Sequence, residues 1–91
     1  MKKDYLDCFA KSLAGHDEGR IYYIADISMD GKCVSLVDGE TRKISMPKIK
    51  KIKHIQIIKM SDATLSEARI KGTLKDEMIK HSIKMLIKTE E

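Results

Sequence analysis

Basic side chains gather in one segment of this sequence, and no acidic residue accompanies them there. Residues 41–59 contain seven lysines and arginines but neither aspartate nor glutamate. A polyanion suits such a segment, because each phosphate that a cation neutralises releases condensed counterions. The competing interpretation is a solvated charged face. The candidate phosphate-binding residues in this segment are Arg42, Lys43, Lys48, Lys50, Lys51 and Lys53.

A loop bounded by two glycines is the second candidate site. Gly15 and Gly19 bracket a polar run that contains His16 and Asp17, and Arg20 follows directly. Glycine is needed where φ is positive or where a backbone approaches a ligand closely. Asp17 can hold such a loop by accepting hydrogen bonds from backbone N–H groups, which leaves other N–H groups and Arg20 to meet phosphate oxygens. The alternative is an ordinary turn.

The sequence contains few residues in patterns typical of an enzyme or a metal site. His16, His54 and His81 lie far apart, and the chain contains no zinc-protease, phosphate-loop, serine-hydrolase or dinucleotide motif. Cys8 and Cys33 share no metal-ligand spacing, and we expect both to be reduced thiols. We therefore expect a protein that is not an enzyme and that uses no cofactor and no metal ion.

Length and composition predict one small folded domain. The chain has 91 residues, 42% of them hydrophobic, and a net charge of +4. Residues 62–91 are balanced, with six basic and six acidic residues, so the excess charge lies before them. No stretch approaches the roughly 20 apolar residues that cross a bilayer, and the start does not resemble a signal peptide. The expected location is the cytoplasm, without membrane contact.

Short apolar runs predict about five strands in the first sixty residues. Such strands can hide their edges only by curling closed, so we expect a mainly β fold, a small barrel over residues 1–60. The expected strands are residues 8–13, 20–27, 33–37, 41–46 and 52–58. Alternation along these strands predicts a core that includes Ile21, Ile24, Val34, Leu36 and Ile55.

Turn residues set the expected boundaries of these strands. Asp30 with Gly31, and Asp38 with Gly39, predict tight turns on either side of the third strand. Pro47 is expected to end the fourth strand, because proline lacks an N–H donor for the ladder. Residues 48–51 would then form a connection with flexible, solvent-exposed lysines.

The last third of the sequence changes to a helical period. Residues 61–72 are expected to be a connector with at most one helical turn, and residues 73–91 a C-terminal amphipathic helix that Thr73 caps. We expect its apolar stripe to cover the barrel; the alternative is an interface with a partner or a second copy of the chain. The stripe consists of Met78, Ile79, Ile83, Leu86 and Ile87.

Two segments of the chain resemble KOW-domain proteins. The first is FAKSLAGHDEGR at residues 9–20, which runs into IYYIADI and looks like the KOW motif of ribosomal and transcription-elongation proteins. The second is LVDGETRK at residues 36–43, followed by MPKIKKIKHI. It is similar to a bacterial group of KOW-domain RNA-binding proteins that is related to large-subunit ribosomal proteins of archaea and eukaryotes.

The resemblance covers residues 5–58 and carries expectations about fold and function. It implies an SH3-like barrel that binds structured RNA and is linked to the ribosome. It also implies that the RNA contacts lie in the loop at residues 15–20 and in the basic stretch at residues 42–53. One departure stands out: His16, Asp17 and Glu18 occupy loop positions where basic residues are common in this family.

Two functions from different classes follow. The first is non-catalytic binding of structured RNA, such as ribosomal RNA or a ribosomal subunit, with lysine and arginine on the phosphates. Tyr22 or Tyr23 would stack on an unpaired base or else pack in the core. The alternative is a protein-interaction adaptor that docks through the barrel surface or the apolar stripe. Only RNA binding should weaken steeply as the salt concentration rises.

Overall fold

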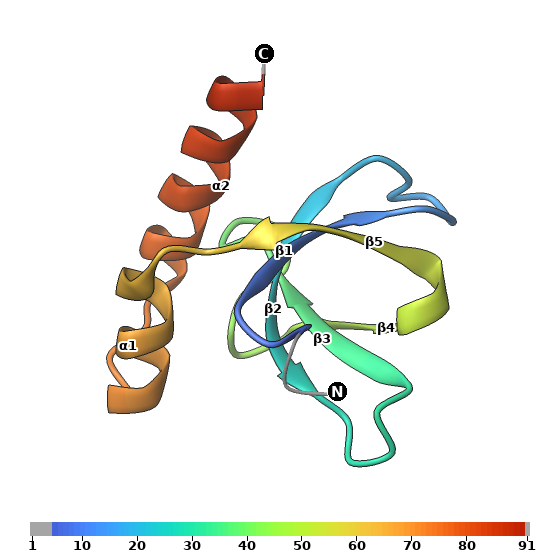
Figure 1. The fold of residues 1–91 in the computed structure, drawn as a ribbon, viewed down its shortest axis with the longest axis horizontal. Coiled ribbons are helices and arrows are strands. Elements are labelled where there is room, and N and C mark those ends of the chain that lie inside the picture. Colours follow the sequence, from blue (N-terminus) through green and yellow to red (C-terminus); the bar gives the residue numbers. More distant parts are fainter. Residues whose placement is uncertain (1–4, 91) are drawn as a thin grey trace.

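A five-stranded antiparallel sheet and two helices make up the computed structural model, which describes residues 5–90 (Figure 1). No helix among these residues is long and apolar enough to cross a membrane. A 3₁₀ turn, Ile52–His54, separates the last two strands. The elements are β1 Cys8–Ser12, β2 Ile21–Ile27, β3 Cys33–Val37, β4 Lys48–Lys51, β5 Ile55–Met60, α1 Ala63–Lys71 and α2 Asp76–Glu90.

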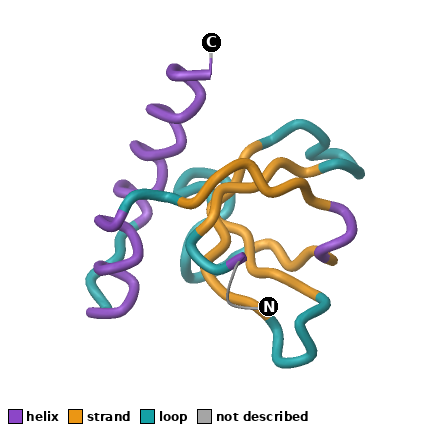
Figure 2. The backbone as a smooth tube through the Cα atoms, viewed as in Figure 1, coloured by secondary structure: helices purple, strands orange, loops and turns teal. Residues whose placement is uncertain are grey.

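The sheet is open, so the expected closed barrel is wrong. Its strand order is β4-β3-β2-β1-β5, and within the described residues the edge strands β4 and β5 do not pair with each other. The 3₁₀ turn joins β4 to β5 at the point where a closed barrel would have hydrogen bonds between these two strands. The Ile52 N–H donates to the Lys32 carbonyl, and the Leu13 N–H donates to the His54 carbonyl, each at 2.8 Å. Because three residues alone join the two edges, the sheet curls strongly (Figure 2).

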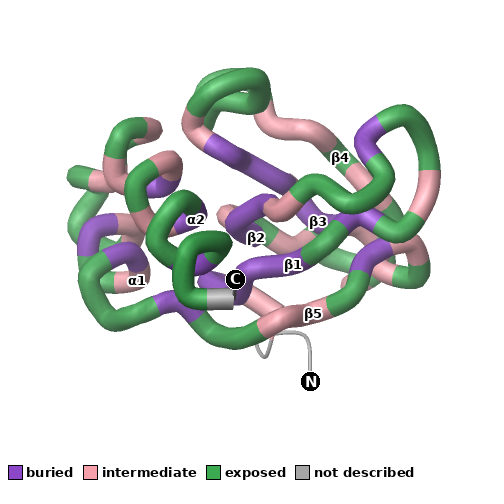
Figure 3. The backbone as a smooth tube through the Cα atoms, turned by 90° about the horizontal axis from the view of Figure 1, so that it is seen from above, coloured by how far each residue is buried: buried purple, intermediate pink, exposed green. Residues whose placement is uncertain are grey.

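Both faces of this curled sheet are buried, each in its own apolar cluster. The inner cluster includes Tyr22, Ile24 and Leu36, and the outer cluster includes Tyr23 and Val37, packed beneath the helices. Neighbouring strand residues point to opposite faces, so β2 contributes side chains to both clusters. The buried stretches of β1 and β2 are seen in Figure 3. Neither tyrosine is exposed, so the expected stacking surface for an unpaired base is absent.

Four of the five expected core residues are buried, namely Ile24, Val34, Leu36 and Ile55. Ile21 is only half buried, because it starts β2 on the outer face, where it flanks the cluster beneath the helices. The strand prediction holds for β3, and to within one residue for β1 and β2.

The expected strand at residues 41–46 is wrong. These residues form turns, with one isolated bridge between Lys43 and Met46. The Asp38 carboxylate accepts the backbone N–H groups of Glu40 (2.9 Å) and Arg42 (2.7 Å), so these donors are satisfied without a ladder. The strand that pairs with β3 comes later, as β4, where a flexible connection was expected. Pro47 precedes this strand instead of ending one.

The helical part begins earlier than the sequence predicts. Residues expected as a connector form α1, which Asp62 caps by accepting the Thr64 N–H at 3.0 Å. Gly72 ends α1 in the left-handed conformation, and the Thr73 N–H donates to the Ala68 carbonyl. Thr73 therefore belongs to the end of α1, and α2 starts only at Asp76.

The apolar stripe of α2 packs on the sheet, as expected. Ile79, Ile83 and Leu86 are buried against the outer face, with Met78 beside them, whereas Ile87 stays exposed. Gly39 makes this close approach feasible, because a Cβ built there would lie 2.2 Å from the Asp76 carbonyl oxygen. The Ile44 N–H also donates to the Asp76 carboxylate at 2.7 Å. Apart from Ile87, the stripe is thus covered within one chain.

Candidate nucleic-acid interface

Two of the candidate lysines point inward at one buried carboxylate. Lys50 Nζ lies 2.8 Å from Asp17 Oδ1, and Lys48 Nζ lies 3.1 Å from Asp17 Oδ2. Alternation along β4 turns these two side chains to the inner face of the sheet, while Ile49 and Lys51 face outward. Only 11% of the Lys50 side chain is exposed. It was expected to be free and solvent-exposed, and that expectation is wrong.

Asp17 is the centre of this cluster, which we call the inner anchor. Its carboxylate also accepts the hydroxyls of Ser12 and Tyr22, each at 2.9 Å. Burial by itself raises the pKa of Asp17, but the hydrogen bonds from the two lysines and the two hydroxyls outweigh it and hold the pKa well below its usual range. Burial and the bond to Asp17 raise the pKa of Tyr22 to about 12.

The inner anchor also shapes the glycine-bounded loop. Lys50 Nζ donates to the Ala14 carbonyl at 2.7 Å, so it ties the loop to β4 through both Ala14 and Asp17. Asp17 holds the loop as expected, although its side chain does so with side-chain donors in place of backbone N–H groups. Gly15 and Gly19 each have a φ of +90°, which explains the requirement for glycine at both positions. His16 and Glu18 are exposed.

Three exposed lysines surround one hollow on the surface. Lys32, Lys51 and Lys53 line a space of about 380 Å³ together with Gly31 and Ile52. None of the three forms an ion pair with any other residue that the structure describes. We call this group the hairpin hollow, because it lies between the β2–β3 hairpin and the 3₁₀ turn.

Lys32 was missed by the sequence reasoning. It stands alone in the sequence, outside the basic run, and the pairing of Cys33 with Lys51 and the bond from the Ile52 N–H to the Lys32 carbonyl bring it beside Lys51 and Lys53. The neighbouring Asp30 carboxylate accepts the Lys32 N–H at 2.9 Å and the Ser28 hydroxyl at 2.6 Å. The sequence did contain one signal for it: Lys32 directly follows the Asp30-Gly31 turn and precedes a strand.

Arg42 and Lys43 lie elsewhere, on the loop that approaches the start of α2. Both are exposed, and the Arg42 carbonyl accepts the N–H groups of Asp38 and Gly39. Arg20 is nearby, since its Nη2 lies 3.4 Å from Asp38 Oδ2 and about half of its side chain is exposed. The basic stretch of the sequence is therefore split into three groups with different surroundings.

A second basic groove lies between the sheet and α2. It has a volume of about 410 Å³, and its walls come from β1, the start of β2, the loop after β3, and α2. Lys11 and Lys84 in this groove were also missed, because Lys11 lies outside the basic run at residues 41–59 and Lys84 lies in the segment whose charge is balanced. The lining includes Lys11, Gly19, Arg20, Glu40, Lys80 and Lys84.

A cluster of the same kind as the inner anchor stands on the outer face of the sheet. Asp7 accepts a hydrogen bond from the Tyr23 hydroxyl, and Arg69 of α1 reaches it with Nε at 2.7 Å and Nη2 at 2.8 Å. Burial by itself raises the pKa of Asp7, but the bonds from Arg69 and Tyr23 outweigh it and lower the pKa. We call this group the outer anchor.

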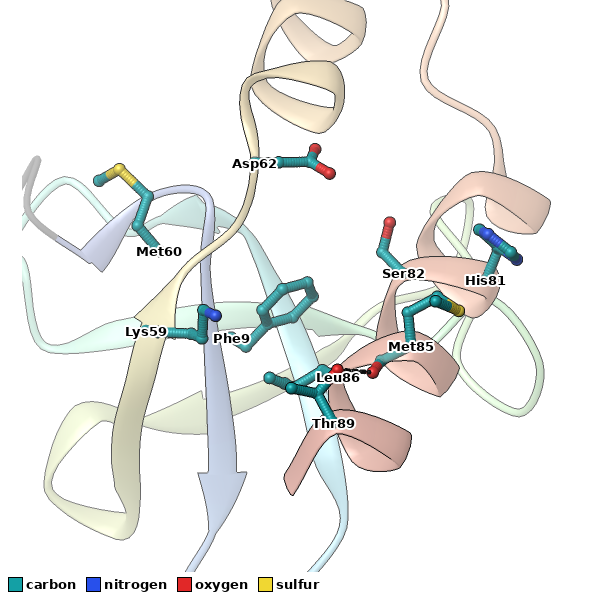
Figure 4. Close-up of a pocket in the computed structure, with 9 residues that line it drawn as sticks. All are labelled: Phe9, Lys59, Met60, Asp62, His81, Ser82, Met85, Leu86 and Thr89. Carbon is teal, nitrogen blue, oxygen red and sulfur yellow. Dashed lines mark hydrogen bonds between the residues drawn. The ribbon is translucent and has the colours of Figure 1, made fainter. Parts of the chain in front are cut away.

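A cleft of about 540 Å³ lies between β5 and α2 (Figure 4). Its floor holds Phe9 and Leu86, both buried. Two of its polar groups are already engaged: the Asp62 carboxylate caps α1, and the Thr89 hydroxyl donates to the Met85 carbonyl at 2.8 Å. The cleft shares no lining residue with the hairpin hollow.

Neither possible metal ligands nor known protein families give further information about the function. Among residues 5–90, no three histidine, cysteine, aspartate or glutamate residues come close enough together to hold a metal ion. No model of a known protein family matches the sequence, and neither does any protein of curated function. Function must therefore be inferred from the arrangement of charge on this surface.

Proposed function

We propose that this protein binds structured RNA without catalysing a reaction, and that the hairpin hollow makes the main phosphate contacts. The observation that carries the proposal is the meeting of Lys32, Lys51 and Lys53 around one hollow that no acidic residue of the described chain lines. Like charges gathered around one hollow repel each other. Phosphate oxygens would relieve that repulsion and release counterions.

The chemistry of the hollow favours the RNA backbone over its bases. Lysine ammonium groups contact phosphates as point charges and carry no sequence information. Both tyrosines of β2 are buried, so they offer no stacking face for a base. Recognition would therefore follow RNA shape and phosphate spacing, as is usual for double-helical RNA.

The resemblance to KOW proteins supports the same proposal and makes it more specific. The curled sheet, with its short 3₁₀ turn between the last two strands, is proposed to be an open form of the SH3-like barrel of that family. The glycine-bounded loop would assist through Gly15, His16 and Gly19, all of which are exposed. Ribosomal RNA in a ribosomal subunit is then the proposed target, inside the cytoplasm.

A fluorescence titration with an RNA duplex at several salt concentrations tests the proposal. If ~3–5 phosphates are neutralised, log affinity should fall against log salt with a slope of about −2 to −5. The double change Lys51→Gln and Lys53→Gln should flatten that slope by about two units and weaken binding at low salt. The matched control is Lys71→Gln with Lys75→Gln, exposed lysines of the helical part.

Equal losses in the two double variants would mean that only net charge matters and would contradict a site at the hollow. If wild-type protein binds neither ribosomal RNA nor ribosomal subunits at low salt, the proposed function fails. A protein partner that binds independently of salt would then favour the adaptor role through the sheet surface.

A further inference from the structure

The groove between the sheet and α2 combines a basic rim with an aliphatic floor. Lys11, Arg20, Lys80 and Lys84 contribute four cations, against the two acids Asp38 and Glu40. The floor consists of Ile21, Ile83 and Ile87. These side chains come from four separate parts of the chain, so the fold has assembled a concave basic surface that no single stretch of the sequence contains.

The two acids of the groove neutralise its cations only weakly. The Asp38 carboxylate is occupied by the Arg42 and Glu40 N–H groups and by the Thr41 hydroxyl at 2.6 Å. Its distance to Arg20 Nη2 is a long 3.4 Å. Glu40 and Lys80 also stand 3.4 Å apart and are both well exposed, and exposed pairs of this kind contribute little.

Two cations of the groove are not neutralised by a neighbouring acid. Lys11 and Lys84 are exposed and form no ion pair with any residue in the described part of the chain. Gly19, which ends the loop beside them, has open space where a Cβ would stand. A ligand can therefore approach the backbone of the loop end closely, and its charge would meet Lys11 from β1 and Lys84 from α2.

We propose that this groove is a second phosphate-binding surface, in which Lys11, Arg20 and Lys84 hold consecutive phosphates of an RNA strand while its sugars lie against the isoleucine floor. This inference rests on the proposed function and extends it. Phosphodiester is favoured over an acidic protein segment because Lys11 of β1 and Lys84 of α2 place cations on both sides of a groove that is also lined by isoleucines. The helix α2 thereby becomes part of the RNA-binding surface.

The groove and the hairpin hollow lie at opposite ends of β2. Arg20 precedes the first residue of the strand, and Lys32 follows the hairpin after the last. A seven-residue strand spans roughly 20 Å at about 3.3 Å per residue. A duplex long enough to cover both surfaces should therefore bind more tightly than a short one that reaches a single surface, because linked contacts raise the effective concentration.

The test compares charge removal at the groove with charge removal at the hollow. Lys11→Gln with Lys84→Gln keeps a polar side chain with part of the aliphatic stem at each position and removes two charges. With the long duplex we expect the salt slope to flatten by about two units relative to wild type, as for the hollow variant. With the short duplex each double variant alone should keep measurable binding through the other surface. The control is again Lys71→Gln with Lys75→Gln.

A gain of affinity provides a second test that misfolding cannot imitate. Glu40→Gln removes an acid from the groove rim and should strengthen duplex binding by about two- to five-fold, in line with a single exposed charge contact of about 0.5–1 kcal/mol. Glu67→Gln, an exposed acid on α1, is the matched control and should leave affinity nearly unchanged.

The outcomes separate the two proposals. If the groove variant behaves like the control while the hollow variant loses binding, the second surface is overturned and the proposed function stands. The second surface is also overturned if Glu40→Gln and Glu67→Gln have equal effects, or if the groove binds polyglutamate as tightly as the duplex. If wild-type protein does not bind RNA at all, the proposed function itself fails.

Discussion

The inner and outer anchors have the same arrangement, a buried aspartate bound by a tyrosine hydroxyl and by basic side chains, but they stabilise different parts of the fold. Tyr22 and Tyr23 are neighbours on β2, yet they point to opposite faces, and each donates its hydroxyl to a buried aspartate. Asp17 of the inner anchor is held by two lysines of the edge strand β4, and Asp7 of the outer anchor by one arginine of α1. The inner anchor closes a loop onto the sheet, whereas the outer anchor fixes a helix.

The difference lies in how each cation can respond. Lysine is a point charge, and the two lysines at Asp17 share one carboxylate, with 11% of the Lys50 side chain and 26% of the Lys48 side chain exposed, whereas Arg69 binds Asp7 through a planar two-point contact. About 29% of the Arg69 side chain is exposed, so it can turn toward water if its partner is lost. Lys50 has far less access to water. The inner anchor should therefore be the less tolerant of change.

The largest effect is expected from Asp17→Asn. This change leaves Lys48 and Lys50 without a counter-charge, and breaking a buried pair from one side costs about 3–5 kcal/mol. Asp7→Asn should cost less, about 1–3 kcal/mol, because Arg69 can reach solvent. Urea unfolding followed by circular dichroism measures both. Equal costs, or a larger cost for Asp7→Asn, would show that the two anchors do not differ in this way.

A somewhat smaller effect is expected from Gly39→Ala, which acts on the outer face alone. The new Cβ would collide with the Asp76 carbonyl and would force a positive φ on alanine. We expect about 2–4 kcal/mol of destabilisation, with faster hydrogen exchange in α2 but not in β4. Gly72→Ala is the control, because it has a similar φ and open space, and should cost only about 1–2 kcal/mol. Equal destabilisation by Gly39→Ala and Gly72→Ala would show that the loss comes from backbone strain and not from disturbed helix packing.

Removing one hydroxyl from each anchor should have a smaller and more equal effect. Tyr22→Phe and Tyr23→Phe each delete a hydrogen bond to a carboxylate and leave the ring in place. Bonds to charged groups contribute about 1.5–3 kcal/mol, and the cations that remain should keep each carboxylate satisfied, so the lower end is expected. Thermal melts of both variants measure this. A much larger loss in Tyr22→Phe would mean that the hydroxyl, and not the lysines, holds Asp17.

Acid should weaken both anchors gradually. The pKa of each aspartate is lowered in the folded protein from its ordinary value of 3.8, so each contributes stability above that value and loses it as the pH falls toward the lowered pKa. Unfolding free energy of the wild type should therefore drop between about pH 5 and about pH 2. Asp17→Asn should remove more of this dependence than Asp7→Asn, because more donors hold its carboxylate. The reverse order in urea titrations at each pH would contradict the assignment.

The sequence predicted the parts of the fold that depend on local pattern. Alternation identified β2 and β3, and the apolar stripe identified α2, because burial on one face leaves a period that can be read directly. Residues 41–46 were mistaken for a strand because Asp38 replaces ladder bonds with side-chain bonds, which no period reveals. The strand β4 was missed altogether, because residues 48–51 were expected to be a flexible connection. Its lysines look like a solvated run until the fold brings Asp17 against them.

The candidate site was predictable in composition but not in arrangement. Charge counting found Lys51 and Lys53 but could not separate them from Lys48 and Lys50, which the inner anchor neutralises. It also missed Lys11 and Lys84, which come together only across the sheet and α2. Pairing between distant residues decides which cations are free, and a single sequence does not contain that information.

The place of β1 in the sheet has a consequence for the order in which the chain folds. β1 pairs with β2, its neighbour in sequence, but also with β5, so that Cys8 lies opposite Met60. A growing chain can form the β1–β2–β3 meander early, whereas its first strand keeps a bare edge until the fifth strand has been made. Closing so long a loop carries an entropic cost, and contacts of this separation slow folding. Completion of the sheet is therefore expected to be the late and rate-limiting event.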